Sequence, residues 1–256
     1  MLFRSLSEHP LPEAPTYNSD GEAILPEYTE LQIMENISSW FDWMNPAWHE
    51  WEWRCMVRAG VDVLMPVYWW NGIDNYWAHE GLVTMASTWH NLKDDIPGLP
   101  KIAMFFDTTC MKQLYCGNVT QDPASPYYGN YTDCWENGPG PNLSDPYWRE
   151  QFWLCIDRFY AVVDEDAAYD FKGSNVVWMY GPGWFEDVGE TVLDYCKTQY
   201  QEKYNRGLLF VGPGGWNKAN VDGVCDWGAC CPGPKNVQPK GRSEERRVGK
   251  ECRSRW

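Results

Sequence analysis

Short apolar runs alternate with longer amphipathic stretches along most of the chain. The runs at 61–70, 101–107, 175–180 and 207–212 are nearly continuous in apolar residues and are bounded by Gly, Pro, Asn or Asp. Continuous apolar runs of this length are typical of strands buried on both faces of a parallel sheet. A further strand is predicted at 221–227. The chain therefore has five predicted strands.

Helical periodicity lies between these runs. The predicted helices span residues 31–44, 46–59, 80–92, 145–163 and 188–204. Pro46 suits a first helical turn and Gly60 a helix end, and Pro66 predicts a bulge within its strand. Residues 1–30 and 108–143 are rich in turn formers and are predicted to be loops.

Alternation of strands and helices predicts βαβ units and an α/β fold with a parallel sheet. Both a doubly wound sheet and part of an eight-stranded barrel fit this alternation. No phosphate-binding glycine motif follows any of the strands, so a nucleotide site has no support. In either arrangement, ligands bind at the carboxyl ends of the strands.

Aromatic and acidic residues gather at these strand ends. Aromatic rings stack on the apolar faces of sugars and carboxylates bind hydroxyl groups, so this pattern indicates a carbohydrate ligand. The candidate substrate-binding residues are Tyr68, Trp69, Trp70, Asn71, Asp107, Tyr180, Trp184, Trp216, Asp226 and Trp227.

Each candidate also has a structural alternative. A single Trp is more often a core residue than a ligand platform, and Asp107 or Asp226 could cap the segment that follows it. Glu186 and Asp187 could be first-turn residues of the next helix. The chain lacks H-E-x-x-H and G-x-S-x-G motifs, so the sequence predicts no metal site, no cofactor and no assignable catalytic residue.

Acidic residues outnumber basic ones. The chain has 21 Lys and Arg against 36 Asp and Glu, for a net charge of −15, which argues against a nucleic-acid partner. No apolar run approaches the roughly 18 residues of a membrane-spanning helix. The oligomeric state is left open by the sequence.

The last 15 residues differ from the rest of the chain. Residues 242–256 read RSEERRVGKECRSRW, which resembles the in-frame translation of a sequencing-library adaptor. We therefore interpret 1–241 as the domain and 242–256 as an artefact, and we expect the natural chain to continue beyond Gly241.

Cysteines and glycosylation motifs indicate an oxidising compartment. Cys110, Cys116 and Cys134 lie in the predicted loop 108–143, a placement that favours disulfides and secretion. Four N-x-S/T motifs begin at Asn36, Asn118, Asn130 and Asn142. No signal peptide follows Met1, so for a secreted protein we expect the natural N-terminus to lie upstream. The alternative is an intracellular α/β protein with free thiols.

Four segments, in order, resemble a known group of barrel proteins. They are AGVDVLMPVYW (59–69), PKIAMFFDTT (100–109), NVVWMYGPG (175–183) and VDGVCDWG (221–228). The order is similar to that of proteins grouped around glycoside hydrolase family 99, the endo-α-mannosidases, and most similar to the domain of unknown function family 5010. The resemblance implies a secreted, partial (β/α)8 TIM-type barrel, truncated at both ends, with Trp69 and Trp70 lining the sugar site.

One feature of the family is missing from the chain. The family-99 enzymes carry their catalytic carboxylates in a late N-E-W-x-E-like segment, and no such segment occurs here. Our leading hypothesis is a glycoside hydrolase-like domain acting on or binding oligosaccharide or polysaccharide. The alternative is a non-catalytic carbohydrate-binding or adhesion domain.

Overall fold

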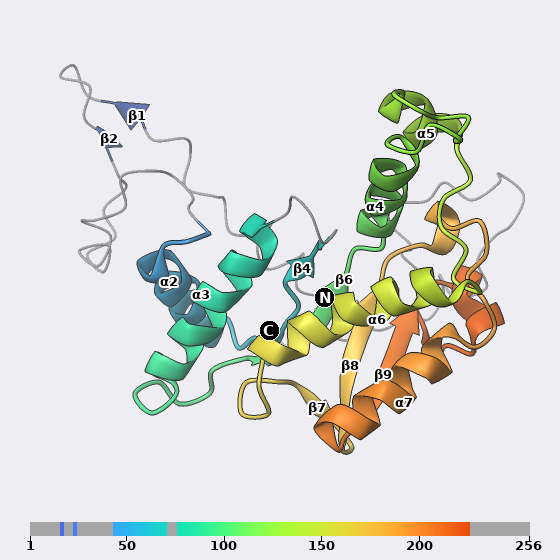
Figure 1. Cartoon of the computed structure of the whole chain (residues 1–256). Helices are drawn as coiled ribbons and strands as arrows, with labels where there is room; N and C mark the ends of the chain where they lie inside the picture. The colour runs from blue at the N-terminus through green and yellow to red at the C-terminus, as the bar shows by residue number, and fades with distance from the viewer. Residues whose placement is uncertain (1–15, 18–22, 25–42, 71–75, 226–256) are drawn as a thin grey trace, which may run out of the picture. The chain divides into compact units, whose positions relative to one another are not determined.

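The computed structural model describes residues 16–17, 23–24, 43–70 and 76–225. Its central sheet contains five parallel strands that neighbour one another in chain order (Figure 1). They are β4 (Val67–Tyr68), β6 (Met104–Phe106), β8 (Ser174–Met179), β9 (Gly207–Gly212) and β10 (Gly223–Val224). The predicted α/β fold with a parallel sheet is thus confirmed, and the described strands form an open sheet. The short β7 (Asp170–Phe171) joins β8 as an antiparallel hairpin.

The predicted bulge at Pro66 is wrong. Strands β3 (Val63–Leu64) and β5 (Lys101–Ile102) pair in the same register as β4 and β6, so no residue is inserted. The carbonyls of residues 62, 64, 66 and 68 all accept bonds from amides of the 101–107 run. Pro66 has no N–H to donate in return, so the proline interrupts the strand without shifting the register.

Four of the predicted helices are present. They are α2 (Pro46–Arg58), α3 (Tyr76–Leu92), α6 (Pro146–Val162) and α7 (Val192–Tyr204). Side chains of Asn45 and Asp145 cap α2 and α6 by accepting bonds from backbone amides two residues on. Helix α7 begins later than predicted, because Gly189 has a left-handed φ of +65° that a helix excludes.

The prediction of a single loop over 108–143 is wrong. The segment contains α4 (Thr109–Val119) and α5 (Tyr131–Asn137). Helix α4 buries one face of its short length, and α5 has only seven residues. A helix of two turns shows too little periodicity to stand out among Gly, Asn and Pro residues.

The predicted loop at 1–30 and the predicted helix at 31–44 fall largely outside the described residues. The two-residue strands β1 (Thr16–Tyr17) and β2 (Ala23–Ile24) pair antiparallel within the segment predicted to be a loop. The predicted helix at 31–44 lies almost wholly outside the described residues.

One face of the sheet carries the core. In successive strands the register aligns Tyr68, Phe106 and Met179, all buried beneath the helices. Tyr68 contacts α3 and α6, and Phe106 contacts α6. On the same face of β8, Asn175 accepts a hydrogen bond from Tyr200 of α7 (2.8 Å). All three helices therefore cover this face, and Figure 1 shows α6 and α7 in front of β8 and β9.

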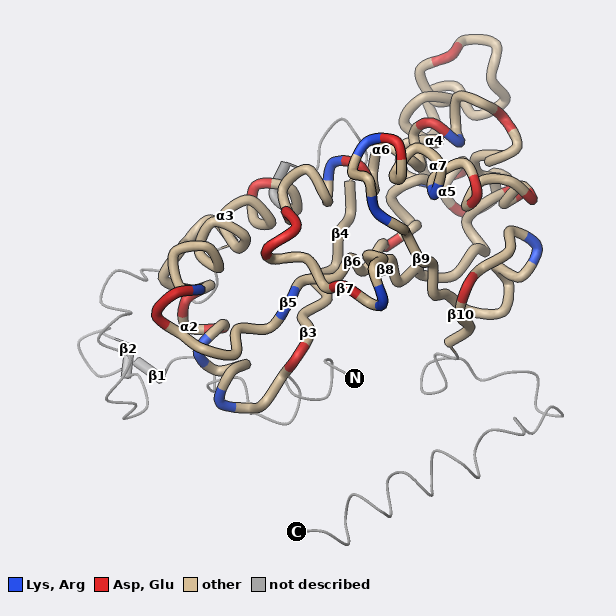
Figure 2. Tube along the Cα trace, turned by 90° about the horizontal axis from the view of Figure 1, so that it is seen from below, with Lys and Arg blue, Asp and Glu red and all other residues tan. Residues whose placement is uncertain are grey.

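The other face of the sheet is apolar and less covered. Its aligned positions are Val67, Phe105, Trp178 and Val211, of which Val67 is 39% exposed and Trp178 and Val211 are half-buried. Strands β4, β6, β8 and β9 contain no charged residue, as their tan trace in Figure 2 shows. An uncharged sheet of this kind is typical of a strand layer with an apolar environment on both sides.

Phe159 provides a test of this packing. The ring is fully buried and lies edge-on to Tyr68, with centroids 5.4 Å apart. We expect Phe159→Ala to lower the free energy of unfolding by about 3–5 kcal/mol, through lost burial and a residual cavity. Val83→Ala, on the exposed side of α3, should change it by less than about 0.5 kcal/mol. Urea denaturation of both variants measures the difference, and equal effects would contradict this packing.

Candidate functional site

Hydrogen bonds join the segments that follow the carboxyl ends of the central strands. The buried Thr108, just after β6, donates its hydroxyl to the carbonyl of Gly181 after β8 (2.9 Å). The indole of Trp216, in the 3-10 helix η3 (Gly214–Ala219), donates to the carbonyl of Tyr180 (2.7 Å). Three of the predicted strand ends therefore lie together, as expected for a parallel sheet.

An offset stack of three aromatic rings lies beside this edge. Trp184, in the 3-10 helix η2 (Pro182–Trp184), stacks on Trp135 of α5 with centroids 5.6 Å apart and planes at 23°. Trp135 in turn stacks on Tyr131, at 6.4 Å and 10°. Tyr131 is 41% exposed, and both tryptophans are half-buried. We call Tyr131, Trp135 and Trp184 the aromatic platform.

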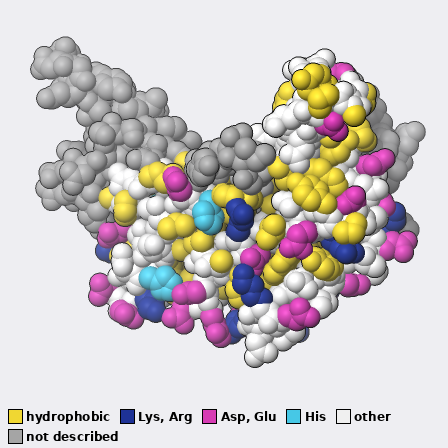
Figure 3. Space-filling view, in the orientation of Figure 1, with side chains coloured by type: hydrophobic (Ala, Val, Ile, Leu, Met, Phe, Trp, Pro, Cys, Tyr) yellow, Lys and Arg dark blue, Asp and Glu magenta, His cyan; other side chains and the backbone are white. Residues whose placement is uncertain are grey.

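Two members of the platform were not among the sequence candidates. Tyr131 and Trp135 were missed because their segment was predicted to be a loop. Their spacing of four residues is the signal that could have revealed them, because side chains at i and i+4 share one face of a helix. Figure 3 shows hydrophobic side chains gathered over the part of the molecule that holds α4 and α5.

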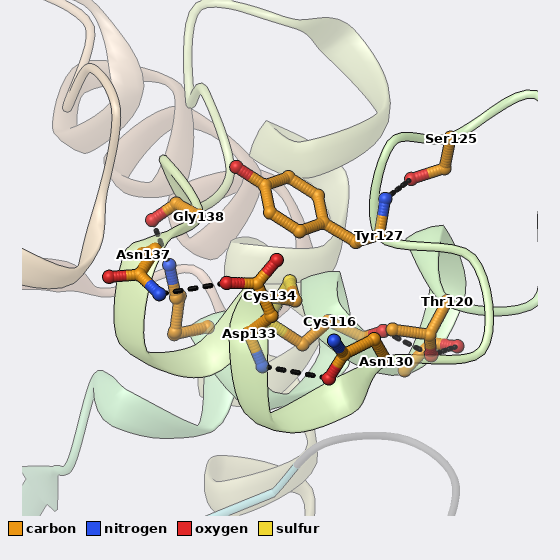
Figure 4. Close-up of a disulfide and its surroundings, with 11 residues drawn as sticks. Cys116, Thr120, Ser125, Tyr127, Asn130, Asp133, Cys134, Asn137 and Gly138 are labelled. Atoms are coloured by element: carbon orange, nitrogen blue, oxygen red, sulfur yellow. Dashed lines mark hydrogen bonds between the residues drawn. A yellow bond between two sulfur atoms is a disulfide. The ribbon is translucent and has the colours of Figure 1, made fainter.

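A disulfide holds α5 against α4. Cys116 and Cys134 are bonded across 18 residues, with their Cα atoms 5.6 Å apart (Figure 4). This bond confirms the expectation of a disulfide in the 108–143 segment. The buried Lys112 of α4 donates its ammonium to the carbonyl of Gly138, at the end of α5, and burial lowers the pKa of this lysine. A cation at a helix C-terminus also interacts favourably with the helix dipole.

The segment after α5 in turn holds Trp184. The amide of Glu186 donates to the carbonyl of Pro141 (3.1 Å), and that of Leu143 donates to the carbonyl of Asp187 (2.8 Å). Gly140 has a φ of +90°, and a Cβ at this position would lie 2.1 Å from the carbonyl oxygen of Trp184. Only glycine permits this approach, so the chain passes directly against the residue that carries the platform's third ring.

Carboxylates follow two platform residues in the sequence, and Glu136, one residue after Trp135, is exposed. Glu186 is exposed two residues after Trp184. Burial first, and then the negative charge of Glu186, raises the pKa of Tyr115. Asp187 accepts bonds from Lys218 (2.6 Å) and Ser144 (3.1 Å), and the bond from Lys218 is the largest cause of its lowered pKa. The site thus combines apolar ring faces with hydrogen-bond acceptors.

Several sequence candidates have structural roles. Tyr68 is buried in the core, where its hydroxyl bonds to Nδ1 of His79 (3.0 Å) and burial raises its pKa. Trp216 is also fully buried. Asp107 accepts bonds from the amide (3.1 Å) and hydroxyl (2.8 Å) of Thr109, which is the capping alternative considered for it. Since Tyr68 and Trp216 present no exposed ring face, we do not keep them in the candidate site.

The other candidates are more accessible or lie outside the description. Trp69 and Trp70 are partly buried against the core, and the guanidinium of Arg158 lies 4.3 Å from the Trp70 ring centroid. Tyr180 is 39% exposed. Of the sequence candidates, Asn71, Asp226 and Trp227 lie outside the described part of the chain, as does the segment 242–256.

Neither metal-ligand geometry in the described residues nor similarity to known proteins assigns a function to this site. Within the described residues, no group of three or more His, Cys, Asp or Glu could hold a metal ion. No helix in the same part of the chain is long and apolar enough to span a membrane. No family model matches the chain, and comparisons with curated proteins and with solved structures find no significant match.

The disulfide should stabilise the platform. For the double variant Cys116→Ser with Cys134→Ser, we expect a loss of about 3 kcal/mol in unfolding free energy, because the unfolded chain loses a loop constraint of this size. Denaturant melts of the oxidised protein and the variant measure the loss. A variant as stable as the oxidised protein would contradict the role of the cross-link.

Gly140 should determine where Trp184 lies. We expect Gly140→Ala to displace Trp184 and weaken the exciton signal of the stacked indoles in circular dichroism, because the added Cβ would collide with a backbone oxygen. The matched control is Gly183→Ala, since a Cβ there meets nothing within 4 Å. An unchanged signal in Gly140→Ala, or an equal loss in Gly183→Ala, would rule out this constraint.

Proposed function

We propose that this chain is a glycoside hydrolase-like domain that binds an oligosaccharide or polysaccharide on the aromatic platform. The observation that carries the proposal is the partly exposed stack of Tyr131, Trp135 and Trp184 beside the carboxyl edge of a parallel sheet. This edge is where α/β proteins bind their ligands.

The offset of the rings supports sugar binding. Atoms in direct contact would be about 3.5–4.0 Å apart. Centroid separations of 5.6 and 6.4 Å between near-parallel rings therefore imply lateral displacement, which leaves part of a ring face uncovered. The C–H groups of a pyranose would pack on these faces, while its hydroxyls would donate to nearby carboxylates. Glu136, one residue after Trp135, and Glu186, two residues after Trp184, are exposed acceptors near the platform residues in sequence.

The order of the strands favours the barrel interpretation of the fold. In a (β/α)8 barrel, parallel strands follow one another in chain order and all helices lie outside, whereas a doubly wound sheet reverses its order and has helices on both faces. Here β4, β6, β8, β9 and β10 are neighbours in sequence order, and α3, α6 and α7 cover one face. With the four resembling segments, this order supports a partial barrel related to families 99 and 5010. The Cys116–Cys134 disulfide supports a secreted protein.

A non-catalytic binding domain is the second candidate. Glycoside hydrolysis requires two carboxyl groups, about 5–5.5 Å apart for retention or 6.5–9.5 Å for inversion. Asp107 and Asp187, two of the described carboxylates near the strand ends, are already engaged with Thr109 and with Lys218 and Ser144. These engagements favour recognition over catalysis by Asp107 and Asp187.

Binding can be tested on the full chain. We expect titration with mannan- and glucan-derived oligosaccharides to change the tryptophan fluorescence. We expect Trp184→Ala or Trp135→Ala to weaken binding about fivefold or more, taking as a scale the about 1–3 kcal/mol by which a nucleobase stacks on an aromatic side chain. The matched control is Phe171→Ala, which removes an exposed ring from β7. Binding that is unchanged in both tryptophan variants would rule out the platform as the site.

An assay for new reducing ends with the same sugars separates the two candidate functions. Products that accumulate with time support the hydrolase. Saturable binding without products supports the binding domain.

A further inference from the structure

A tight turn precedes α5 and exposes one sequence motif. The amide of Asn130 donates to the carbonyl of Tyr127 (2.9 Å), and the amide of Gly129 donates to that of Thr120 (2.9 Å). Gly129 has a left-handed φ of +70°. The turn leaves Tyr128 59% exposed, and Asn130 is exposed as well. An exposed aromatic ring thus lies two residues before the asparagine of an N-x-T motif.

The Asn130 side chain has a structural role that uses only its oxygen. Its Oδ1 accepts a bond from the amide of Asp133 (3.2 Å) and caps α5 (Figure 4). Among the described residues, its side chain makes no other hydrogen bond. The nitrogen Nδ2 is the atom that becomes glycosylated in such motifs, so a glycan and the helix cap are compatible at this residue.

In the other two N-x-S/T motifs of the described residues, the asparagine side chain is less accessible. Nδ2 of Asn118 donates to the hydroxyl of Tyr147 (3.3 Å), and Asn118 is half-buried. Asn142 is also half-buried, and the hydroxyl of Ser144 in its motif donates to Asp187 (3.1 Å). Of the three, Asn130 therefore has the most accessible nitrogen.

We propose that Asn130 carries an N-linked glycan whose first sugar packs on the ring of Tyr128. The donor would be an oligosaccharide carried on a polyprenyl diphosphate. The amide nitrogen would bond to the anomeric carbon as the bond from that carbon to the diphosphate oxygen breaks. The nitrogen loses a proton, the polyprenyl diphosphate leaves, and nothing is oxidised or reduced. The disulfide beside this turn is independent support for passage through a secretory compartment, where such donors act.

Occupancy of Asn130 can be measured on the full chain, fused to a cleavable secretory leader and produced in eukaryotic cells. Peptide-N-glycosidase in H₂¹⁸O converts a glycosylated asparagine to labelled aspartate, which peptide mass spectrometry detects in total cell extract. We expect the label at Asn130 and the loss of one glycan in Asn130→Asp, a variant that keeps a good helix cap. The matched controls are Asn118→Asp and Asn142→Asp, which should keep this label. An unlabelled Asn130 peptide overturns the proposal, and measurement in total extract makes this result independent of secretion.

Packing of the glycan on Tyr128 is tested separately, by the melting temperature. We expect the glycan to raise the melting temperature of the wild-type chain, relative to the enzymatically deglycosylated chain, and to have no such effect in Tyr128→Ala. Phe171→Ala, which removes another exposed ring, should keep the full glycan effect. A glycan effect of the same size in Tyr128→Ala would overturn the proposed packing.

Discussion

Parallel pairing of β6, β8 and β9 is the constraint on which the rest of the structure depends. Parallel strands end at the same edge of a sheet, so the segments that follow β6 and β8 must leave from neighbouring positions. The bond from Thr108 to Gly181 fixes these two exits together. Trp184 lies on the segment after β8, and Trp135 lies on the longer segment after β6. Their stacking therefore follows from the pairing of two strands that are about 70 residues apart in sequence.

The segment that carries α4 and α5 relies on specific bonds more than on a core of its own. A seven-residue helix is marginally stable in isolation, because the free-energy cost of helix nucleation exceeds the stabilisation that two helical turns provide. Here the Cys116–Cys134 bond, the Lys112 ammonium and the Asn130 cap fix α5 at three points. Gly140 then allows the following residues to pass against Trp184. The platform is thus held by covalent, polar and steric contacts in turn.

The sequence predicted the parallel α/β fold because the strands are separate apolar runs and two of the long helices, α2 and α6, have recognisable starts. Pro46 and Pro146 follow the capping residues Asn45 and Asp145, so these helix starts could be placed within a residue or two. Which face each strand residue occupies could not be predicted. A run that is apolar on both faces shows no alternation, and this is why Tyr68, a core residue, was taken for a sugar contact.

The sequence could identify only one of the three platform residues. Its position after a strand made Trp184 a candidate, whereas Tyr131 and Trp135 belong to a helix too short to be recognised. The fold brings the three rings together, and although Asp107 and Asp187 are engaged in hydrogen bonds, Glu136 and Glu186 are exposed close in sequence to Trp135 and Trp184. Cleavage would require two carboxyl groups at a defined separation, whereas the proposed binding requires only the ring faces and a nearby acceptor.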